Sequence, residues 1–338
     1  MSSRLVHVEN SIIEIFQEKL LENPYLHEIA QYFKQNQPIE DNEDNQDNIL
    51  DTPDIEITPI RVSTITVLCK LGIDINLDVF FQNFTPYYNE EGKYRIVSME
   101  YMDNTPKGIP KQKKKKQSYA NTNLVKKRTS FYNQITIIMD YIKSINLKLF
   151  RNGSIHITGI IDEEQGKKAV EFLGNEIRAI YAKDKTITNG DINLLGIYAW
   201  DIVLINSDFA CNFKIRREKL YEIIDSKYNL VVNYESDSYP GVKTSFYWSE
   251  KDNGTKDSIT GLYDGIKSGI CKCKIGSTCK GKGRGTLDPE DCCRKITISI
   301  FQSGKIIITG ARAIKQVDEC YKFIICLLKR YYHDISRQ

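Results

Sequence analysis

Two ten-residue segments of this chain, 151 residues apart, have nearly the same sequence. They run from Phe150 to Gly159 and from Phe301 to Gly310, and six of the ten positions are identical. In each segment a glycine separates two stretches rich in β-forming residues, which predicts two strands joined by a tight turn. A duplication at this spacing indicates that one supersecondary unit is built twice.

The similarity continues on both sides of the hairpins. Each half begins with a strand pattern, at 60–69 and at 201–211, that leads into a short helix pattern. Each hairpin is followed by an amphipathic helix, whose apolar stripe is Ala169, Leu173, Ile177 and Ile180 in the first half and Ile314, Val317, Tyr321, Ile324 and Leu328 in the second. These patterns predict an α+β fold in which two pseudo-symmetric repeats share one antiparallel sheet, with helices on one face.

The two repeats account for residues 57–185 and 186–338. Ahead of them, residues 1–56 have a helical apolar pattern at 11–35, followed at 40–54 by seven acidic residues with no Lys or Arg. A stretch with so few apolar side chains cannot offset the entropy lost on ordering. We therefore expect an N-terminal helical segment and a solvated acidic linker.

The first repeat has a lysine-rich insertion at about 86–129. Nine positive charges occur there with no acidic residue between them: Lys107, Lys111, Lys113 to Lys116, Lys126, Lys127 and Arg128. Such a run can keep a loop solvated, contact a polyanion such as nucleic acid, or serve as a nuclear-address signal. The composition leaves all three interpretations open.

The second repeat has an insertion at about 249–293 that holds five of the chain's nine cysteines: Cys271, Cys273, Cys279, Cys292 and Cys293. Thiolates gathered this closely in a reducing compartment suit Zn²⁺, with four of the five as ligands, and the segment contains no His. Because the spacing is not the usual pair of C-x2-C motifs, unliganded thiols and disulfides remain alternatives. The other four cysteines fall in strand or helix patterns and are expected in the core: Cys69, Cys211, Cys320 and Cys326.

The second hairpin and its surroundings resemble the TATA-box-binding protein (TBP) family. The family's F-x-S-G-K-x-x-x-T-G-A motif occurs as Phe301 to Ala311, its F-P-G as Tyr239-Pro240-Gly241, and its V-S-T as Val62-Ser63-Thr64. The resemblance covers about 57–182 and 200–332, and the insertions are similar to elaborations of the TBP-like proteins of large DNA viruses. It implies a saddle of two pseudo-symmetric repeats, whose curved, ten-stranded antiparallel sheet has helices on the convex face.

The function implied by the resemblance is that of a DNA-binding general transcription initiation factor. Such a protein binds double-stranded, A/T-rich promoter DNA through the minor groove and bends it, because aromatic side chains wedge between base steps. The wedges would be Phe131 and Phe150 in the first repeat and Tyr239 and Phe301 in the second. Phe131 is placed only by its distance before the hairpin, and Tyr239 stands where the family has Phe. The alternative is that these four rings belong to the hydrophobic core.

The resemblance also implies that the concave face of the sheet lies on the DNA. Strand alternation places Val62, Thr64 and Asn206 on this face. The resemblance implies that His156, Thr158, Ile307 and Thr309 lie on it as well. The family has an Asn in each opening strand, and here Ile60 takes that position in the first repeat. Leu204 takes it in the second, unless a two-residue deletion brings Asn206 there.

Charged residues on the same face also depart from the family pattern. Lys148 and a protonated His156 would suit a minor groove, whereas an ionised Asp208 would be repelled by its negative potential. These changes leave the preferred DNA sequence, and TATA specificity itself, open. They do not alter the predicted fold.

Protein partners are implied as well. Glu235 and Asp237 resemble the acidic stirrup with which the family engages a TFIIB-type initiation factor and, through it, the RNA polymerase machinery; a solvated loop is the alternative. Asp208 and Ile60 favour a second function, that of a diverged TBP-like regulator that binds initiation-factor proteins rather than TATA DNA.

Other classes of function find less support in the sequence. No apolar run approaches the roughly 18 residues of a membrane span, and no signal-peptide pattern follows the start, so an intracellular protein of the nucleus or of a viral transcription site is expected. We find no metalloprotease helix motif, nucleophile elbow or P-loop. The sequence therefore predicts that the protein is not an enzyme and has no small-molecule substrate. No cofactor is required, and Zn²⁺ in the cysteine-rich insertion is the one candidate.

Overall fold

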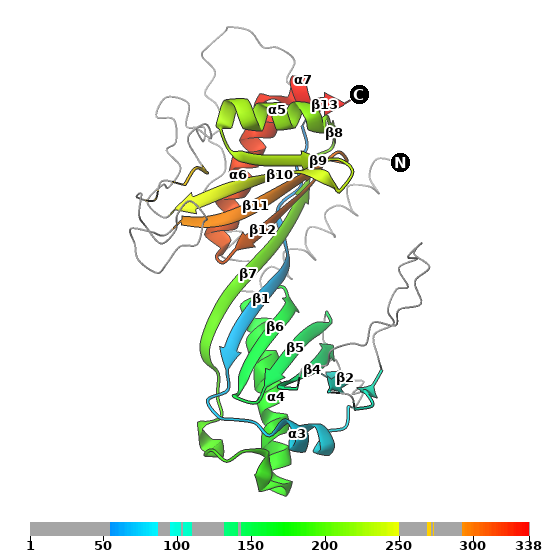
Figure 1. The fold of residues 1–338 in the computed structure, drawn as a ribbon, viewed down its shortest axis with the longest axis vertical. Helices are drawn as coiled ribbons and strands as arrows, with labels where there is room; N and C mark the ends of the chain where they lie inside the picture. The colour runs from blue at the N-terminus through cyan, green and yellow to red at the C-terminus, as the bar shows by residue number, and fades with distance from the viewer. Residues whose placement is uncertain are drawn as a thin grey trace, which may run out of the picture. The chain divides into compact units, whose positions relative to one another are not determined.

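The computed structural model describes residues 55–86, 95–102, 104–109, 132–140, 143–249, 269–271, 273 and 293–337 (Figure 1). They belong to one compact unit, residues 54–338, which contains both sequence repeats. The helix predicted at 11–35 and the acidic linker lie outside the described residues. Among the described helices, none has the length and apolarity needed to cross a membrane.

The first repeat contains six strands and two α-helices among its described residues. They are β1 (Arg61–Lys70), α3 (Leu77–Asn83), β2 (Arg95–Tyr101), β3 (Lys107–Gly108), β4 (Gln134–Asp140), β5 (Ile145–Phe150), β6 (Ser154–Ile160) and α4 (Glu163–Lys183). The 21-residue helix α4 begins where the sequence offers a cap, because the side chain of Asp162 accepts a hydrogen bond of 2.7 Å from the backbone N–H of Gln165. Two short 3₁₀ turns, Lys185–Ile187 and Ile192–Leu194, lead to the second repeat.

The second repeat follows the same general order of strand, short helix, further strands, hairpin and long helix, although its additional short elements differ. It comprises β7 (Tyr198–Ala210), β8 (Lys214–Ile215), α5 (Arg217–Tyr228), β9 (Val231–Glu235), β10 (Tyr239–Ser249), β11 (Cys293–Phe301), β12 (Lys305–Ala311), α6 (Ile314–Arg330), α7 (Tyr332–Ile335) and β13 (Ser336–Arg337). Strands β8 and β13 pair with each other as a separate two-stranded sheet. The hairpin β11–β12 and helix α6 therefore correspond to β5–β6 and α4.

The described strands of both repeats form one sheet of eleven strands, in the order β3-β2-β4-β5-β6-β1-β7-β12-β11-β10-β9. Every pairing in it is antiparallel. The repeats meet at β1 and β7, where Ile65 lies opposite Ile205 (Figure 1). The predicted fold class, α+β with a shared antiparallel sheet and two repeats, is confirmed.

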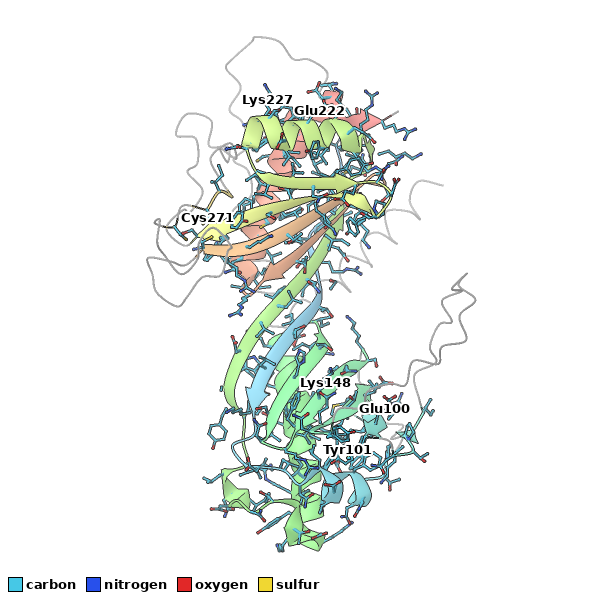
Figure 2. All side chains as sticks on the ribbon, viewed as in Figure 1. Glu100, Tyr101, Lys148, Glu222, Lys227 and Cys271 are labelled. Carbon is cyan, nitrogen blue, oxygen red and sulfur yellow. The ribbon has the colours of Figure 1, made fainter. Side chains whose placement is uncertain are left out.

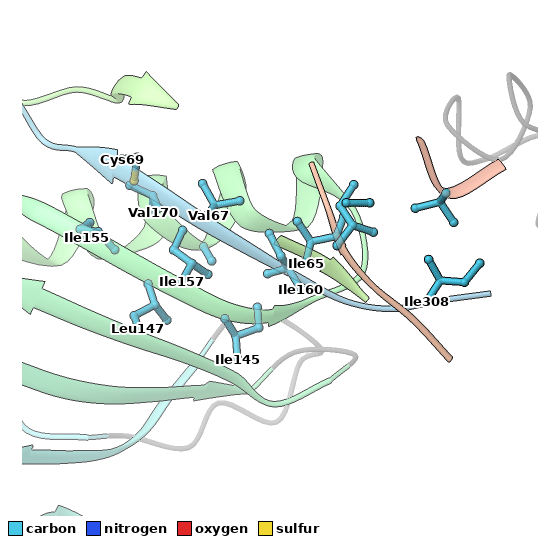
Figure 3. Close-up of a cluster of buried hydrophobic side chains, with 14 of the residues drawn as sticks. Ile65, Val67, Cys69, Ile145, Leu147, Ile155, Ile157, Ile160, Val170 and Ile308 are labelled. Atoms are coloured by element: carbon cyan, nitrogen blue, oxygen red, sulfur yellow. The ribbon is translucent and has the colours of Figure 1, made fainter. Parts of the chain in front are cut away.

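Strand alternation places the core between the sheet and the long helices. On β1, Ile65, Val67 and Cys69 are buried, and the neighbouring strand β6 contributes the buried Ile155 and Ile157 (Figure 3). Helix α4 covers these residues with its predicted stripe, which is buried throughout: Ala169, Leu173, Ile177 and Ile180. Among the described residues, one face of the sheet thus packs against the helices, and the other has no helix on it.

The turn of each hairpin docks in the same way on the chain that leads to the first helix of its own repeat. Gly153 and Gly304 both have positive φ, +70° and +82°. In the first repeat Leu71 donates to Gly153 (2.9 Å) and Ile75 to Arg151 (2.7 Å); in the second, Cys211 donates to Gly304 (3.0 Å) and Ile215 to Gln302 (2.9 Å). The donors are 140 residues apart in both cases, so the duplication extends to individual backbone hydrogen bonds.

The lysine-rich insertion differs from the prediction in two respects. Residues 95–101, which fall inside the segment 86–129, form strand β2 of the main sheet, so the inserted stretch is shorter than expected. The short strand β3 then pairs with β2 and gives the sheet one strand more than the ten expected. Strand β2 has a broken alternation, because its register shifts between Ile96 and Ser98, and this hides it in the sequence.

Lys107, the first residue of the predicted basic run, has a structural role within the fold. Its ammonium group donates hydrogen bonds to the backbone carbonyls of Phe81, Gln82 (3.1 Å) and Phe84 (2.8 Å), at the C-terminal end of α3. These carbonyls carry the negative end of the helix dipole, which a cation stabilises. Lys107 is therefore engaged within the fold, while the predicted basic residues from 111 to 128 lie outside the described residues.

Candidate nucleic-acid interface

The face of the sheet turned away from the helices, called here the open face, carries most of the predicted contact residues. Its central part consists of half-buried or exposed side chains from four adjacent strands, together with the buried Thr66: Val62, Thr64 and Leu68 on β1, Leu204, Asn206 and Asp208 on β7, His156 and Thr158 on β6, and Ile307 and Thr309 on β12. The alternation predicted for these strands is confirmed. Small, hydroxyl-bearing and apolar groups dominate at the centre.

Asn206 lies at the centre of the open face, between Thr64 on β1 and Thr309 on β12. The hydroxyl of Thr309 donates a hydrogen bond to the side-chain oxygen of Asn206. The backbone carbonyl of Asn206 accepts another, of 3.0 Å, from the hydroxyl of Ser63. The bond from Thr309 orients the side chain of Asn206, because an anchored amide oxygen also orients the amide nitrogen.

The register identifies the counterpart of Asn206 in the first repeat. Thr309 lies opposite Asn206, and the matching residue of the first hairpin, Thr158, lies opposite Thr66. Thr66 therefore takes the equivalent position. Ile60, which the sequence comparison placed there, precedes β1 and packs against the core instead.

Asp208 is paired with a cation across the junction of the repeats. The guanidinium of Arg61 contacts both carboxylate oxygens, with Nη2–Oδ1 and Nη2–Oδ2 distances of 2.9 and 3.1 Å, and Nε lies 3.2 Å from Oδ1. The side chain of Arg61 is 72% exposed and that of Asp208 only 18%. The sequence suggested an isolated carboxylate on the open face. In the structure the carboxylate is instead paired with Arg61. Arg61 was missed because its partner is 147 residues away.

An aromatic pair lies on the open face in the second repeat. The rings of Tyr239 and Phe301 are 5.6 Å apart between centroids, at an interplanar angle of 55°. Both are half-buried, and the Lys243 ammonium lies 3.6 Å from the Tyr239 centroid. Gly241 lies directly opposite Phe301 and brings the rings together, because any side chain there would meet both of them.

The same register points to a different residue in the first repeat. Phe150 is half-buried and lies opposite Gln134, just as Phe301 lies opposite Gly241. Two residues before Gly241 is Tyr239, and two residues before Gln134 is Tyr132, which is 69% exposed. Tyr132 is thus the register equivalent of Tyr239. Phe131, the residue predicted from the sequence, lies outside the described residues.

His156 and Lys148 are neighbours on adjacent strands of the open face. Burial lowers the pKa of His156 below its ordinary value of 6.5, and the positive charge of Lys148 lowers it further. The protonated form of His156, which would suit a minor groove, is therefore disfavoured in the free protein. Neither cause is visible in the linear sequence, because burial and the lysine opposite the imidazole both result from strand pairing.

A titration should reveal this arrangement. Because the folded state binds the His156 proton less tightly than the unfolded chain, its contribution to stability is complete above pH 6.5 and is lost as the pH falls through the folded pKa. Replacing Lys148 by methionine should raise the pKa of His156 and reduce that loss, whereas Lys305→Met in the second hairpin should do neither. NMR titration of the histidines, with urea unfolding above and below pH 6.5, measures both effects; equal pKa values in wild type and Lys148→Met would contradict the prediction.

The acidic residues predicted to engage a partner lie around a tight turn. Glu235 ends β9, opposite Tyr239, and Asp237 lies in the turn itself; both are exposed. The Ser238 hydroxyl donates to the Glu235 carboxylate (3.0 Å), and the Ser236 hydroxyl to that of Asp237 (3.3 Å). The turn therefore presents two carboxylates in fixed positions next to the aromatic pair.

Three of the five insertion cysteines converge. The Sγ atoms of Cys271, Cys273 and Cys293 all lie within 4.8 Å of one another. Cys279 and Cys292 lie outside the described residues. Of the cysteines expected in the core, Cys69, Cys211 and Cys320 are buried, and burial raises the pKa of Cys69 to about 12; Cys326 is half-buried.

Comparison with known proteins bears on this architecture. A TATA-box-binding protein-like protein of Acanthamoeba polyphaga mimivirus is 32% identical over 295 residues, which cover 82% of this chain and 67% of the viral protein. The family model of transcription factor TFIID, or TATA-binding protein, matches residues 290–331, which include the hairpin β11–β12 and helix α6. The chain belongs to the TBP family. Its role is therefore related to transcription, in line with the non-enzymatic character of the family.

Among solved structures, TBP of Methanococcus jannaschii is similar to this TBP-family chain, with a TM-score of 0.41 and 13% sequence identity. The match covers 81% of this chain and 99% of the archaeal protein. The family assignment itself rests on the viral relative and the family model.

Proposed function

We propose that this TBP-family protein binds double-stranded promoter DNA with the open face of its sheet, in the minor groove, and bends it. The observation that carries the proposal is the pair of Tyr239 and Phe301, two half-buried rings held in contact on the face that none of the described helices covers. Wedge-shaped aromatic residues at this position can enter a base step and kink the duplex, with unstacking offset by a larger contact area.

The centre of the open face supports the same proposal. A minor groove presents a degenerate pattern of acceptors on A·T pairs, so it is read by shape and by a few hydrogen bonds rather than by many charges. The half-buried Thr64, Thr158, Asn206 and Thr309 offer such hydrogen bonds, and Val62 and Ile307 offer apolar contact. These groups favour an A/T-rich DNA site, but they do not predict the order of its base pairs.

In the proposed complex the acidic turn is available to a protein partner. Glu235 and Asp237 lie beside the aromatic pair, and their exposed carboxylates suit a basic surface of a TFIIB-type factor, which in turn recruits the polymerase. Such a role places the protein in the nucleus or at a viral transcription site. The alternative, a regulator that binds only proteins, loses one of its two arguments because Asp208 is paired with Arg61.

Selection of bound duplexes from a random pool by the full-length protein tests the proposal. We expect enrichment of A/T-rich sites of about one octamer, together with bending detected by fluorescence transfer between dyes at the duplex ends. A chain that enriches no sequence and leaves the duplex straight at low salt would be a protein-binding regulator, and the DNA proposal would be abandoned.

The Arg61–Asp208 pair should tune DNA affinity. Replacing Arg61 by alanine leaves an unpaired carboxylate facing the negative potential of the groove, and we expect affinity to fall about tenfold, which is roughly 1.4 kcal/mol. Asp208→Asn should raise affinity, and the double variant should return close to wild type. Binding constants of the wild type, the two single variants and the double variant at one salt concentration measure these changes, and unchanged affinity in both single variants would show that the pair does not face the DNA.

A further inference from the structure

The cysteine cluster, formed by Cys271, Cys273 and Cys293, lies beside strand β10, near the point where β10 stops pairing with β9. Strand β9 pairs with β10 only between Tyr239 and Ser245. Beyond that point the backbone N–H of Tyr247 donates a 2.8 Å hydrogen bond to the carbonyl of Gly269 instead. The segment 269–271 thus takes over the edge of β10 after β9 has ended, as a cover for backbone groups that would otherwise remain open to pairing.

Packing fixes this segment at its first two residues. Gly269 has φ +79° and lies so close to Phe246 that a Cβ would fall 2.6 Å from the ring. Ile270 packs against the core. Cys271 directly follows these two anchored residues and lies near the ends of β10 and β11 (Figure 2). Cys273 lies two residues further along the chain, and its Sγ atom is within 4.8 Å of those of Cys271 and Cys293.

The third thiol comes from the last residue of the insertion. Cys293 is the first residue of β11, lies opposite Ser249 on β10, and is 1% exposed. The short stretch that carries Cys271 and Cys273 and the start of β11 thus approach each other at one point, where the three sulfur atoms converge.

The distances suit a tetrahedral metal ion. With Zn–S bonds of about 2.3 Å, sulfur ligands of a tetrahedral Zn²⁺ lie about 3.8 Å apart. The three Sγ atoms, within 4.8 Å of one another, reach this spacing with small changes of side-chain torsion. A disulfide could join only two of the three, and would leave the third thiol buried or half-buried beside it.

We propose that Cys271, Cys273 and Cys293 bind a structural Zn²⁺ ion that clamps the insertion onto the edge of β10. The metal would link residues 271–273 to the start of β11, and so add to the anchoring that Gly269 and Ile270 already provide. The role is structural rather than catalytic, and it is independent of whether the open face binds DNA. Cys279 and Cys292 are the candidates in the sequence for the fourth ligand.

Metal analysis of the full-length protein, purified with reductant and without chelator, provides the test. We expect about one zinc per chain in the wild type. Cys271→Ser, Cys273→Ser and Cys293→Ser should each lose most of it, whereas Cys326→Ser, a half-buried cysteine on α6, should keep it. Cys279→Ser and Cys292→Ser identify the fourth ligand by the same measurement.

Two further measurements keep the test decisive if a variant fails to fold. Co²⁺ added to the metal-free wild type should give a sulfur-to-cobalt charge-transfer band and the intense visible bands of a tetrahedral site. Hydrogen exchange at the Tyr247 amide should be slow with Zn²⁺ and fast after chelation, while amides of the β5–β6 hairpin stay unchanged. Absence of zinc, iron in its place, a disulfide among the three cysteines, or equal zinc loss in Cys326→Ser would each overturn the proposal.

Discussion

Replacing Phe301 by alanine is expected to lower the affinity for an A/T-rich duplex by about 5- to 150-fold, which corresponds to roughly 1–3 kcal/mol. The ring lies half-buried on the open face, against Tyr239, so its loss removes a wedge without opening the core beneath the helices. Bending should weaken more than affinity, because the remaining contacts of the sheet bind a straighter duplex. Fluorescence transfer across a labelled duplex measures the bend, and anisotropy measures the affinity.

The matched control is Phe172→Ala. Phe172 is also half-buried, but it lies on helix α4 and packs against the core from the other side of the sheet. It should affect stability without affecting the bend angle of the bound DNA. Tyr132→Ala and Phe150→Ala extend the comparison to the first repeat, where the register predicts that Tyr132 takes the place of Tyr239. If Phe172→Ala and Phe301→Ala reduce bending equally, the aromatic pair is not a wedge.

Replacing Gly153 by alanine is expected to destabilise the fold by at least about 2 kcal/mol. Its φ of +70° is unfavourable for any residue with a Cβ, and an added Cβ would lie 2.1 Å from the carbonyl oxygen of Ile73. The neighbouring backbone cannot retreat easily, because Leu71 donates a hydrogen bond of 2.9 Å to the carbonyl of Gly153 itself. Urea unfolding followed by circular dichroism measures the change.

Two further variants separate the causes of that loss. Gly153→Asn relieves the torsional part, because Asn tolerates a left-handed backbone, but it keeps the steric conflict and should remain destabilising. Gly196→Ala serves as the control, since its φ is not positive and the nearest atom to an added Cβ is 3.5 Å away in Tyr198. A Gly153→Ala variant as stable as Gly196→Ala would show that the turn is not held against residues 71–75.

The sequence alone predicted the fold well, because its main signals are local. Hairpin turns need glycine with positive φ, and a helix that covers a sheet needs an apolar stripe, so the repeat and its amphipathic helices could be placed directly. Strand β2 was missed for an equally local reason. Its bulge interrupts the alternation of buried and exposed residues, and a lysine-rich stretch follows it. For these reasons the sequence pattern assigns residues 95–101 to an insertion rather than to a strand.

The candidate site was predicted less completely. Strand alternation assigned Val62, Thr64 and Asn206 to the face that the structure gives them, because the direction of a side chain depends only on its place in its own strand. The partner of a side chain depends on the strand beside it, and here the sequence had no signal. Arg61 opposite Asp208 and Lys148 opposite His156 both belong to this class.

The duplicated α+β unit, the turn glycines and the face on which each strand residue lies can be read from the amino-acid order, because they follow from backbone torsions and from periodicities within a few residues. The register between β1 and β7 emerges only in the folded protein, where it makes Thr66 the counterpart of Asn206 and pairs Arg61 with Asp208. Only in the folded protein, too, do Cys271, Cys273 and Cys293 converge. The physical reason is that residues more than a hundred positions apart, or separated by a long insertion, are brought together only when the sheet and its helices pack as one body.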